Sequence, residues 1–217
     1  MSGMDDEREG FAAFLLRMRQ RGIGSRELFA AIEATPRHNF VPGQWHDALW
    51  SEGMLPIECG EAIEGIDLQA AVMTALDLAP GQRVLEVGTG SGFTAALLGR
   101  LSGRVLSVER YKTLGELARQ RLEALGIESV VVRHADGSRP LVSEGPFDRI
   151  VVWAAFDSYP RSFVEMLSTG GVMVAAVGPG DGAQELMRLS KVGSRFERED
   201  IGKVRLQPIM PGMAAAL

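Results

Sequence analysis

The stretch RVLEVGTGSG, residues 83–92, decides the fold of this chain. Its first half is a short, mostly apolar run of the kind that forms a strand buried in a sheet, and its second half is a glycine loop. A helical pattern, FTAALLGRL, follows at once over residues 93–101. Glycines in such a loop let a ligand approach the backbone, and the first turn of the following helix offers free N–H groups. The stretch therefore predicts a strand, a ligand-binding loop and a helix in an α/β fold.

Further strands are predicted on both sides of this element. Short apolar runs, several rich in valine, occupy residues 104–108, 130–133, 150–153 and 172–177, and helical patterns separate most of them. Strands buried between helices have this composition. The region after residue 184 instead alternates apolar and polar residues around Gly193, which indicates an antiparallel hairpin. We predict a Rossmann-like, doubly wound and mostly parallel seven-stranded sheet that ends in this hairpin.

The N-terminal part is predicted to be helical. Apolar residues recur at three- and four-residue steps over residues 5–21, Ser25 is placed to cap a second helix that ends before Pro36, and residues 66–78 again have helical period. The segment between them, PRHNFVPGQW, is rich in proline and predicts a loop. We expect residues 1–80 to form a helical extension with an acceptor-side loop, and residues 81–217 to form the ligand-binding domain, together in one compact unit.

Composition excludes several classes of protein. The 217 residues include one cysteine and three histidines without metal-ligand spacing, so we expect neither a disulfide nor a structural metal. The net charge of −5 argues against broad nucleic-acid binding, and no apolar run approaches the roughly 20 residues that span a bilayer. No targeting segment is visible, so we expect a cytoplasmic protein without membrane contact.

An acid at the next strand end identifies the class of ligand. Glu109 closes the run VLSVE, 19 residues after Gly90, where a carboxylate can accept hydrogen bonds from both hydroxyls of a ribose. The glycine loop and this acid together predict a nucleoside-type cofactor. The dinucleotide fingerprint does not fit, because Phe93 stands where its third glycine belongs, and no Gly-Lys-Ser/Thr of a P-loop occurs.

The E-x-G-x-G-x-G pattern that begins at Glu86 resembles the cofactor loop of class I S-adenosylmethionine-dependent methyltransferases. After the third strand, His134-Ala135-Asp136-Gly137 looks like the segment that contacts adenine. The resemblance implies S-adenosyl-L-methionine as the cofactor. The residues expected to bind it are Glu86, Gly88, Thr89, Gly90, Ser91, Gly92, Glu109, Arg110, Asp136 and Gly137.

Three further segments resemble one family within this class. PRHNFVP (36–42), LPI (55–57) and FEREDIG (196–202), followed by Val204-Arg205, look like the protein-L-isoaspartate O-methyltransferase family, and the likeness runs from about Ser25 to Pro208. That family repairs damaged proteins by methylating the free carboxylate of L-isoaspartyl residues, so the resemblance implies a damaged protein or peptide as partner. It also implies contacts with the acceptor from four residues: Ile63, Ile66, Val204 and Arg205.

The acceptor segment departs from the family pattern. Where the family typically has glutamine, threonine and serine, this chain has Glu61, Ala62 and Glu64, and Glu58 and Asp67 flank them. Two like charges about 4 Å apart repel by roughly 4 kcal/mol at an effective dielectric near 20, which disfavours a carboxylate acceptor unless a proton is shared. Glu64 has three open interpretations: a protonated partner of the substrate carboxylate, a general base for an amine acceptor, or a cap of the helix that follows. Three aromatic residues are candidates for lining the acceptor cleft: Trp45, Trp50 and Trp153.

Three functions therefore remain open. The first is methylation of isoaspartyl carboxylates. The second is methylation of another acceptor, an amine or a small molecule, with Glu64 as the catalytic base. The third is a cofactor-binding module without turnover. The sequence does not distinguish among them, and it gives no oligomeric state.

Overall fold

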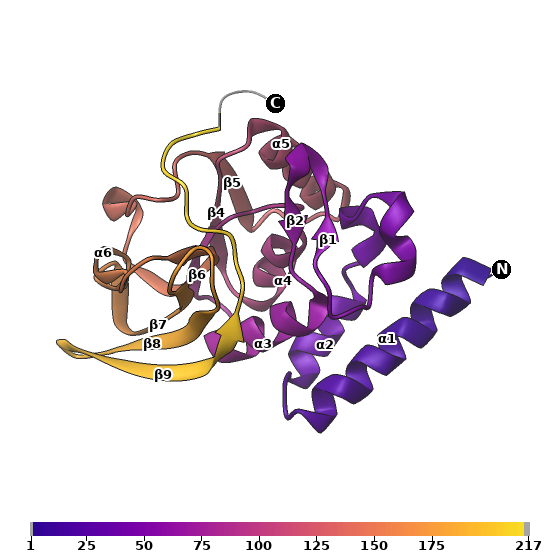
Figure 1. Ribbon diagram of the computed structural model, residues 1–217, viewed down its shortest axis with the longest axis horizontal. Coiled ribbons are helices and arrows are strands. Elements are labelled where there is room, and N and C mark those ends of the chain that lie inside the picture. The colour runs from indigo at the N-terminus through magenta and orange to yellow at the C-terminus, as the bar shows by residue number, and fades with distance from the viewer. Residues whose placement is uncertain (1, 215–217) are drawn as a thin grey trace.

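A seven-stranded mixed sheet forms the centre of the computed structural model, which describes residues 2–214 (Figure 1). The strand order is β5-β4-β3-β6-β7-β8-β9; neighbours pair in parallel from β5 to β7, and β8 and β9 are antiparallel. The strands are β3 Arg83–Val87, β4 Arg104–Glu109, β5 Val130–His134, β6 Phe147–Phe156, β7 Leu167–Val177, β8 Gln184–Val192 and β9 Arg195–Val204. This architecture confirms the predicted fold class, including the C-terminal hairpin.

Alternate residues of the central strands face two separate apolar clusters. Val84 of β3 and Val151 of β6 belong to the cluster on the helical side, whereas Leu85 and Ile150 belong to the cluster on the other side. All four are at most 1% exposed. Because both faces of these strands are buried, their sequences are continuous apolar runs and do not alternate between apolar and polar residues.

Most helices pack on one face of the sheet. The helical elements are α1 Ser2–Gln20, α2 Arg26–Glu33, α3 Ile66–Leu76, α4 Phe93–Leu101, α5 Lys112–Ala124, α6 Arg161–Val164, and the 3-10 turns η1 Arg37–Phe40, η2 Gly43–Ala48, η3 Glu58–Gly60 and η4 Val142–Glu144. Buried residues of α1 to α5 share one apolar cluster, and the opposite cluster is closed by Phe163 and Val164 of α6. The predicted cap of α2 is confirmed, because the N–H of Leu28 donates to Oγ of Ser25 at 3.1 Å.

The connector before α3 contains a small hairpin that the sequence did not predict. Strands β1 (Leu55–Pro56) and β2 (Ala62–Ile63) pair antiparallel around η3. A Cβ atom built on Gly90 would lie 3.4 Å from Cγ2 of Ile63, so the hairpin rests directly on the glycine loop. The unusual acceptor segment is thereby held over the end of β3.

The residues that follow β9 return to the centre of the sheet. The N–H of Ala155 donates to O of Gln207, and the N–H of Ile209 donates to O of Ala155, both at 2.8 Å. The C-terminal segment thus runs beside the end of β6, as Figure 1 shows in yellow. Among residues 2–214 no helix is long and apolar enough to cross a membrane. The division of the chain at residue 80 stays a prediction.

Candidate active site

A pocket lies where the carboxyl ends of β3, β4 and β6 meet. One wall is the glycine loop, the opposite wall is the β1–β2 hairpin with the start of α3, and the C-terminal segment closes a third side. Its lining residues are Ile57, Glu61, Ala62, Ile63, Glu64, Gln69, Val87, Gly88, Thr89, Gly90, Ser91, Thr94, Val108, Glu109, Arg110, Tyr111, Leu114, Gly137, Ser138, Trp153, Ala154, Gln207, Pro208, Ile209 and Met210. The mixture of apolar side chains with a few polar groups is typical of a small-molecule site.

The glycine loop requires glycine at its three glycine positions. Gly88, Gly90 and Gly92 have φ values of 93°, 53° and 89°, in the left-handed region that other residues rarely adopt. A Cβ on Gly92 would also approach Cβ of Ala118 in α5 to 3.0 Å. Gly88, Thr89, Gly90 and Ser91 lie in the pocket wall, whereas Gly92 lies behind it and allows α4 and α5 to pack closely.

Glu109 stands at the end of β4 and is bound to the glycine loop. Its Oε2 accepts from the N–H of Gly90 and its Oε1 from the N–H of Tyr111, each at 2.9 Å. Burial raises the pKa of this carboxyl group, and the two N–H donors oppose the rise. Each oxygen retains a lone pair for an incoming hydroxyl. Arg110 lines the pocket beside Glu109, and its buried Nε has no hydrogen-bond partner among residues 2–214.

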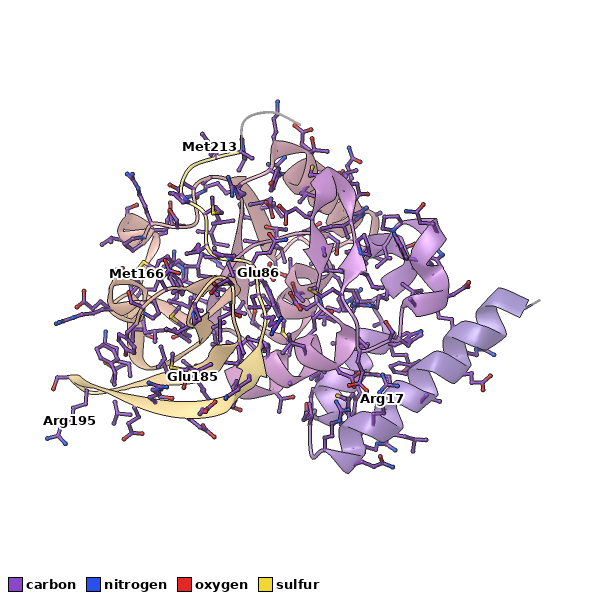
Figure 2. The ribbon with its side chains drawn as sticks, in the orientation of Figure 1. Arg17, Glu86, Met166, Glu185, Arg195 and Met213 are labelled. Carbon is purple, nitrogen blue, oxygen red and sulfur yellow. The ribbon has the colours of Figure 1, made fainter. Side chains whose placement is uncertain are left out.

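Glu86 is buried beneath the pocket and is not part of its wall (Figure 2). Its carboxylate accepts from the hydroxyls of Thr94 and Ser107, both at 2.6 Å, and from Nε1 of Trp153 at 3.1 Å. Burial raises its pKa to about 7. Thr94 and Trp153 do line the pocket, so Glu86 acts by fixing two wall residues.

The segment predicted to contact adenine lies only partly in the wall. Gly137 and the neighbouring Ser138 line the pocket, but Asp136 does not. The Asp136 carboxylate instead accepts from the N–H of Ser138 at 2.9 Å and from its hydroxyl at 2.6 Å. In this geometry Asp136 orders the turn that carries Ser138 into the pocket.

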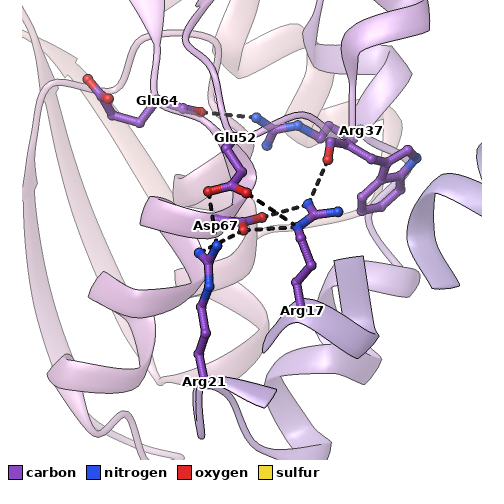
Figure 3. Close-up of polar contacts among 7 residues, drawn as sticks. Arg17, Arg21, Arg37, Glu52, Glu64 and Asp67 are labelled. Atoms are coloured by element: carbon purple, nitrogen blue, oxygen red, sulfur yellow. Dashed lines mark hydrogen bonds and ion pairs between the residues drawn. The ribbon is translucent and has the colours of Figure 1, made fainter. Parts of the chain in front are cut away.

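The acids of the acceptor segment separate into different environments. Asp67 is nearly buried and faces α1, where it accepts from Nη2 of Arg17 at 2.8 Å and from Nη1 of Arg21 at 3.1 Å (Figure 3). Glu58 pairs with Nη2 of Arg121 at 2.9 Å. Only Glu61 and Glu64 of this group line the pocket. The sequence therefore overstated the negative charge that an acceptor would meet.

Glu64 points into the pocket and does not cap α3. The N-cap position belongs to Gly65, and none of the described side chains hydrogen-bonds to the start of the helix. Figure 3 shows the Glu64 carboxylate turned away from the Arg17, Arg21 and Asp67 cluster, while its backbone oxygen accepts from Arg37. Burial raises the pKa of Glu64 to about 7. Of its three interpretations, capping is excluded by this geometry.

The four predicted acceptor residues do not lie together. Ile63 lines the pocket, but Ile66 is fully buried in the apolar cluster under α3. Val204 packs against the same cluster from β9, and Arg205 is exposed. The family resemblance implied an acceptor contact for Ile66, but the first turn of α3 directs this side chain into the apolar cluster instead.

Several residues of the pocket wall were not predicted from the sequence. They come from the first turn of α3, the start of α5 and the segment after β9: Gln69, Tyr111, Leu114, Gln207, Pro208, Ile209 and Met210. Tyr111 could have been found, because it follows the predicted strand end at Glu109. The C-terminal residues carry no such signal, since only the tertiary path brings them beside β6.

Comparisons with known proteins show which family of proteins the chain matches. Residues 11–213 match the family described as Protein-L-isoaspartate(D-aspartate) O-methyltransferase (PCMT). The chain is 46% identical over 202 residues to the protein-L-isoaspartate O-methyltransferase of Rhizobium meliloti (strain 1021), covering 93% of this chain and 99% of that protein. It is 42% identical over 204 residues to protein-L-isoaspartate O-methyltransferase 2 of Rhodopseudomonas palustris (strain HaA2), with 94% of each covered.

Solved structures agree on the fold. A protein from Plasmodium falciparum assigned to this family, crystallised in complex with S-adenosyl-L-homocysteine, superposes with a TM-score of 0.78 at 20% identity and covers 91% of this chain and 97% of that one. A structure titled protein-L-isoaspartate O-methyltransferase gives a TM-score of 0.79 at 23% identity, covering 94% of this chain and 67% of that one. With the family match over nearly the whole chain, these findings confirm the resemblance: the chain belongs to the protein-L-isoaspartate O-methyltransferase family of S-adenosylmethionine-dependent methyltransferases.

Proposed function

We propose that this protein transfers the methyl group of S-adenosyl-L-methionine to the free carboxylate of L-isoaspartyl residues in damaged proteins or peptides. The observation that carries the proposal is the contact between the acceptor hairpin and the cofactor loop, where Ile63 lies against Gly90. An acceptor held by residues 61–64 would meet a ligand on the glycine loop within one pocket. The family names of the relatives support the choice of acceptor.

The residues of the pocket fit the cofactor. At Gly88 and Gly90 the backbone itself forms the pocket wall, and Glu109 offers free lone pairs to ribose hydroxyls. Gly137 and Ser138 would lie beside the base, and Ile209 and Met210 add apolar surface. Arg110 also lines this pocket, and its buried Nε has no partner in the described part of the chain. The relative from Plasmodium falciparum, bound to S-adenosyl-L-homocysteine, supports this assignment.

The chemistry requires positioning more than acid or base catalysis. When bound, the cofactor supplies an electrophilic methyl group on a sulfonium. An ionised carboxylate attacks it without losing a proton, so the protein has to hold the two in line and exclude water. Ile57 and Ile63 provide an apolar wall for this purpose, and Trp153 is fixed in the pocket by its bond to Glu86.

Glu64 is compatible with a carboxylate acceptor when it is protonated. A neutral carboxyl group donates one hydrogen bond and removes the repulsion between two anions. Its burial and the absence of a partner among the described residues favour the neutral form near pH 7 and below. We therefore assign Glu64 a contact with the acceptor.

The experiment is labelled methyl transfer to an isoaspartyl peptide beside its normal aspartyl twin. The proposal expects transfer to the isoaspartyl peptide and at least about 100-fold less to the twin, a difference of about 2.7 kcal/mol. Equal transfer, or none, would reject it. Transfer to an amine peptide instead would favour Glu64 as a general base. We propose that the enzyme acts in the cytoplasm.

A further inference from the structure

A buried glutamine faces the acceptor side of the pocket. Gln69 lies in the first turns of α3, is 3% exposed, and lines the same wall as Glu64. Its Oε1 accepts a hydrogen bond of 2.6 Å from Nη1 of Arg37. The amide nitrogen makes no hydrogen bond with the described residues. An amide donor without a partner among the described residues, in the wall of a pocket, is available to a ligand.

Arg37 fixes which end of this amide faces the pocket. The guanidinium is fully buried, lies 4.5 Å from the ring centroid of Phe93, and donates from Nη2 to the backbone oxygen of Glu64 at 3.1 Å. Guanidinium groups have donors only, so the oxygen of Gln69 must face Arg37. Flipping the amide would bring two donors together. The Nε2 of Gln69 is therefore turned away from Arg37, and the lining position of Gln69 directs it to the pocket.

Several other side-chain donors in the wall are already used, and the Arg110 side chain lies beside Glu109 on the cofactor side of the pocket. Thr94 and Trp153 donate to Glu86, and Ser138 donates to Asp136. The acceptor hairpin itself has no hydroxyl, since its residues over 61–64 are Glu-Ala-Ile-Glu. An anionic acceptor needs N–H or O–H donors, and the Gln69 amide has two N–H bonds to give.

The charge of Arg37 also suits an anion. No carboxylate among the described residues forms an ion pair with Arg37; its polar partners are an amide oxygen and a backbone oxygen. In a carboxylate complex, the side-chain amide of Gln69 would separate the ligand, bound at Nε2, from the guanidinium of Arg37, and all three groups would lie in a poorly solvated site. Such an arrangement favours a negative ligand and polarises the amide that binds it.

We propose that Gln69 is a specificity-determining residue that binds the acceptor carboxylate through Nε2, and that Arg37 is the positioning residue that holds the amide in its donor orientation. This inference rests on the proposed function and names the group of the enzyme that recognises the substrate carboxylate. It concerns binding of the acceptor and leaves the cofactor side of the pocket unchanged.

The decisive variant is Gln69→Glu, which is nearly isosteric. A glutamate here would pair with Arg37, so the fold should keep its stability, but the N–H donor is lost and a negative charge faces the acceptor. Two peptides are compared with each protein loaded with S-adenosyl-L-homocysteine: an isoaspartyl peptide and its twin with a carboxamide in place of the free α-carboxylate. Calorimetry gives both dissociation constants. Gln120→Glu, an exposed site on α5, is the matched control.

The wild type and the control should bind the carboxylate peptide at least about tenfold more tightly than its carboxamide twin. Gln69→Glu should abolish or reverse that preference, raise KM for the isoaspartyl peptide about 30-fold or more, and leave S-adenosyl-L-homocysteine affinity within about twofold. An unchanged preference in a folded Gln69→Glu protein with normal cofactor binding would overturn the inference and leave the proposed function standing. Should this variant not fold, Gln69→Met applies the same criterion without a new charge. A wild type that neither binds nor methylates the isoaspartyl peptide would reject the proposed function and the inference together.

Discussion

Nη2 of Arg17 lies 2.8 Å from Oδ1 of Asp67 and joins the N-terminal helix α1 to the start of α3. The Asp67 side chain is 6% exposed, and a second arginine, Arg21, reaches its other oxygen. An acid that is close to the acceptor segment in sequence is thus a structural ion pair. This relationship holds in place the helix that carries Gln69.

Replacing Arg17 by methionine should lower the free energy of unfolding by roughly 1–3 kcal/mol, because a nearly buried carboxylate loses its closest partner while Arg21 remains. Chemical denaturation measures the change. Arg19→Met, on the exposed side of the same helix, should have an effect within about 0.5 kcal/mol. Equal effects of the two substitutions would show that the ion pair does not stabilise the fold.

Glu64 should make stability depend on pH. Burial raises its pKa from 4.5 to about 7 in the folded protein, so the folded state holds this proton more tightly than the unfolded state. Stability is therefore lost as pH rises from about 4.5 to 7. Glu64→Gln removes that loss, and its stability relative to wild type should be higher at pH 8 than at pH 5 by about 1–3 kcal/mol. Glu123→Gln, an exposed site on α5, should show no such difference in the same ligand-free denaturation series.

The same group should limit activity at high pH. Ionised Glu64 would repel the acceptor carboxylate, so kcat/KM for an isoaspartyl peptide should fall by up to about tenfold per pH unit once Glu64 loses its proton. The bound sulfonium would shift this midpoint below the value of the free protein. Glu64→Ser should give a flatter profile and higher kcat/KM than wild type at pH 8.5. Parallel profiles for the two proteins would contradict a contact between Glu64 and the acceptor.

Cofactor affinity should depend on Glu109. Glu109→Ala removes the carboxylate proposed to bind the ribose and leaves the N–H groups of Gly90 and Tyr111 without their acceptor. The expected loss of about 3 kcal/mol corresponds to roughly 100-fold weaker binding of S-adenosyl-L-homocysteine by calorimetry. Glu116→Ala, which breaks only an exposed pair with Lys112, should bind normally. Unchanged affinity in Glu109→Ala would exclude the ribose assignment.

Much of the cofactor site could be predicted because its parts are local. A strand, a glycine loop and a helix occupy consecutive residues, and parallel pairing of β3 with β4 brings Glu109 to Gly90 without any further information. The acceptor side depends on contacts between distant segments. Arg37 and Gln69 are 32 residues apart, and the C-terminal segment meets Ala155 more than 50 residues after that strand position.

The sequence by itself determined the fold class, the family and the cofactor loop, because buried strands, left-handed glycines and strand-end acids are properties of short segments. It also showed that the acceptor segment carries acids in place of hydroxyls. Only the tertiary structure decided what those acids do: Asp67 and Glu58 are neutralised by arginines from α1 and α5, and Glu64 is buried in the pocket. The physical reason is that the charge an acceptor meets depends on the burial of each acid and on its partners from distant segments. Neither can be predicted from the local sequence.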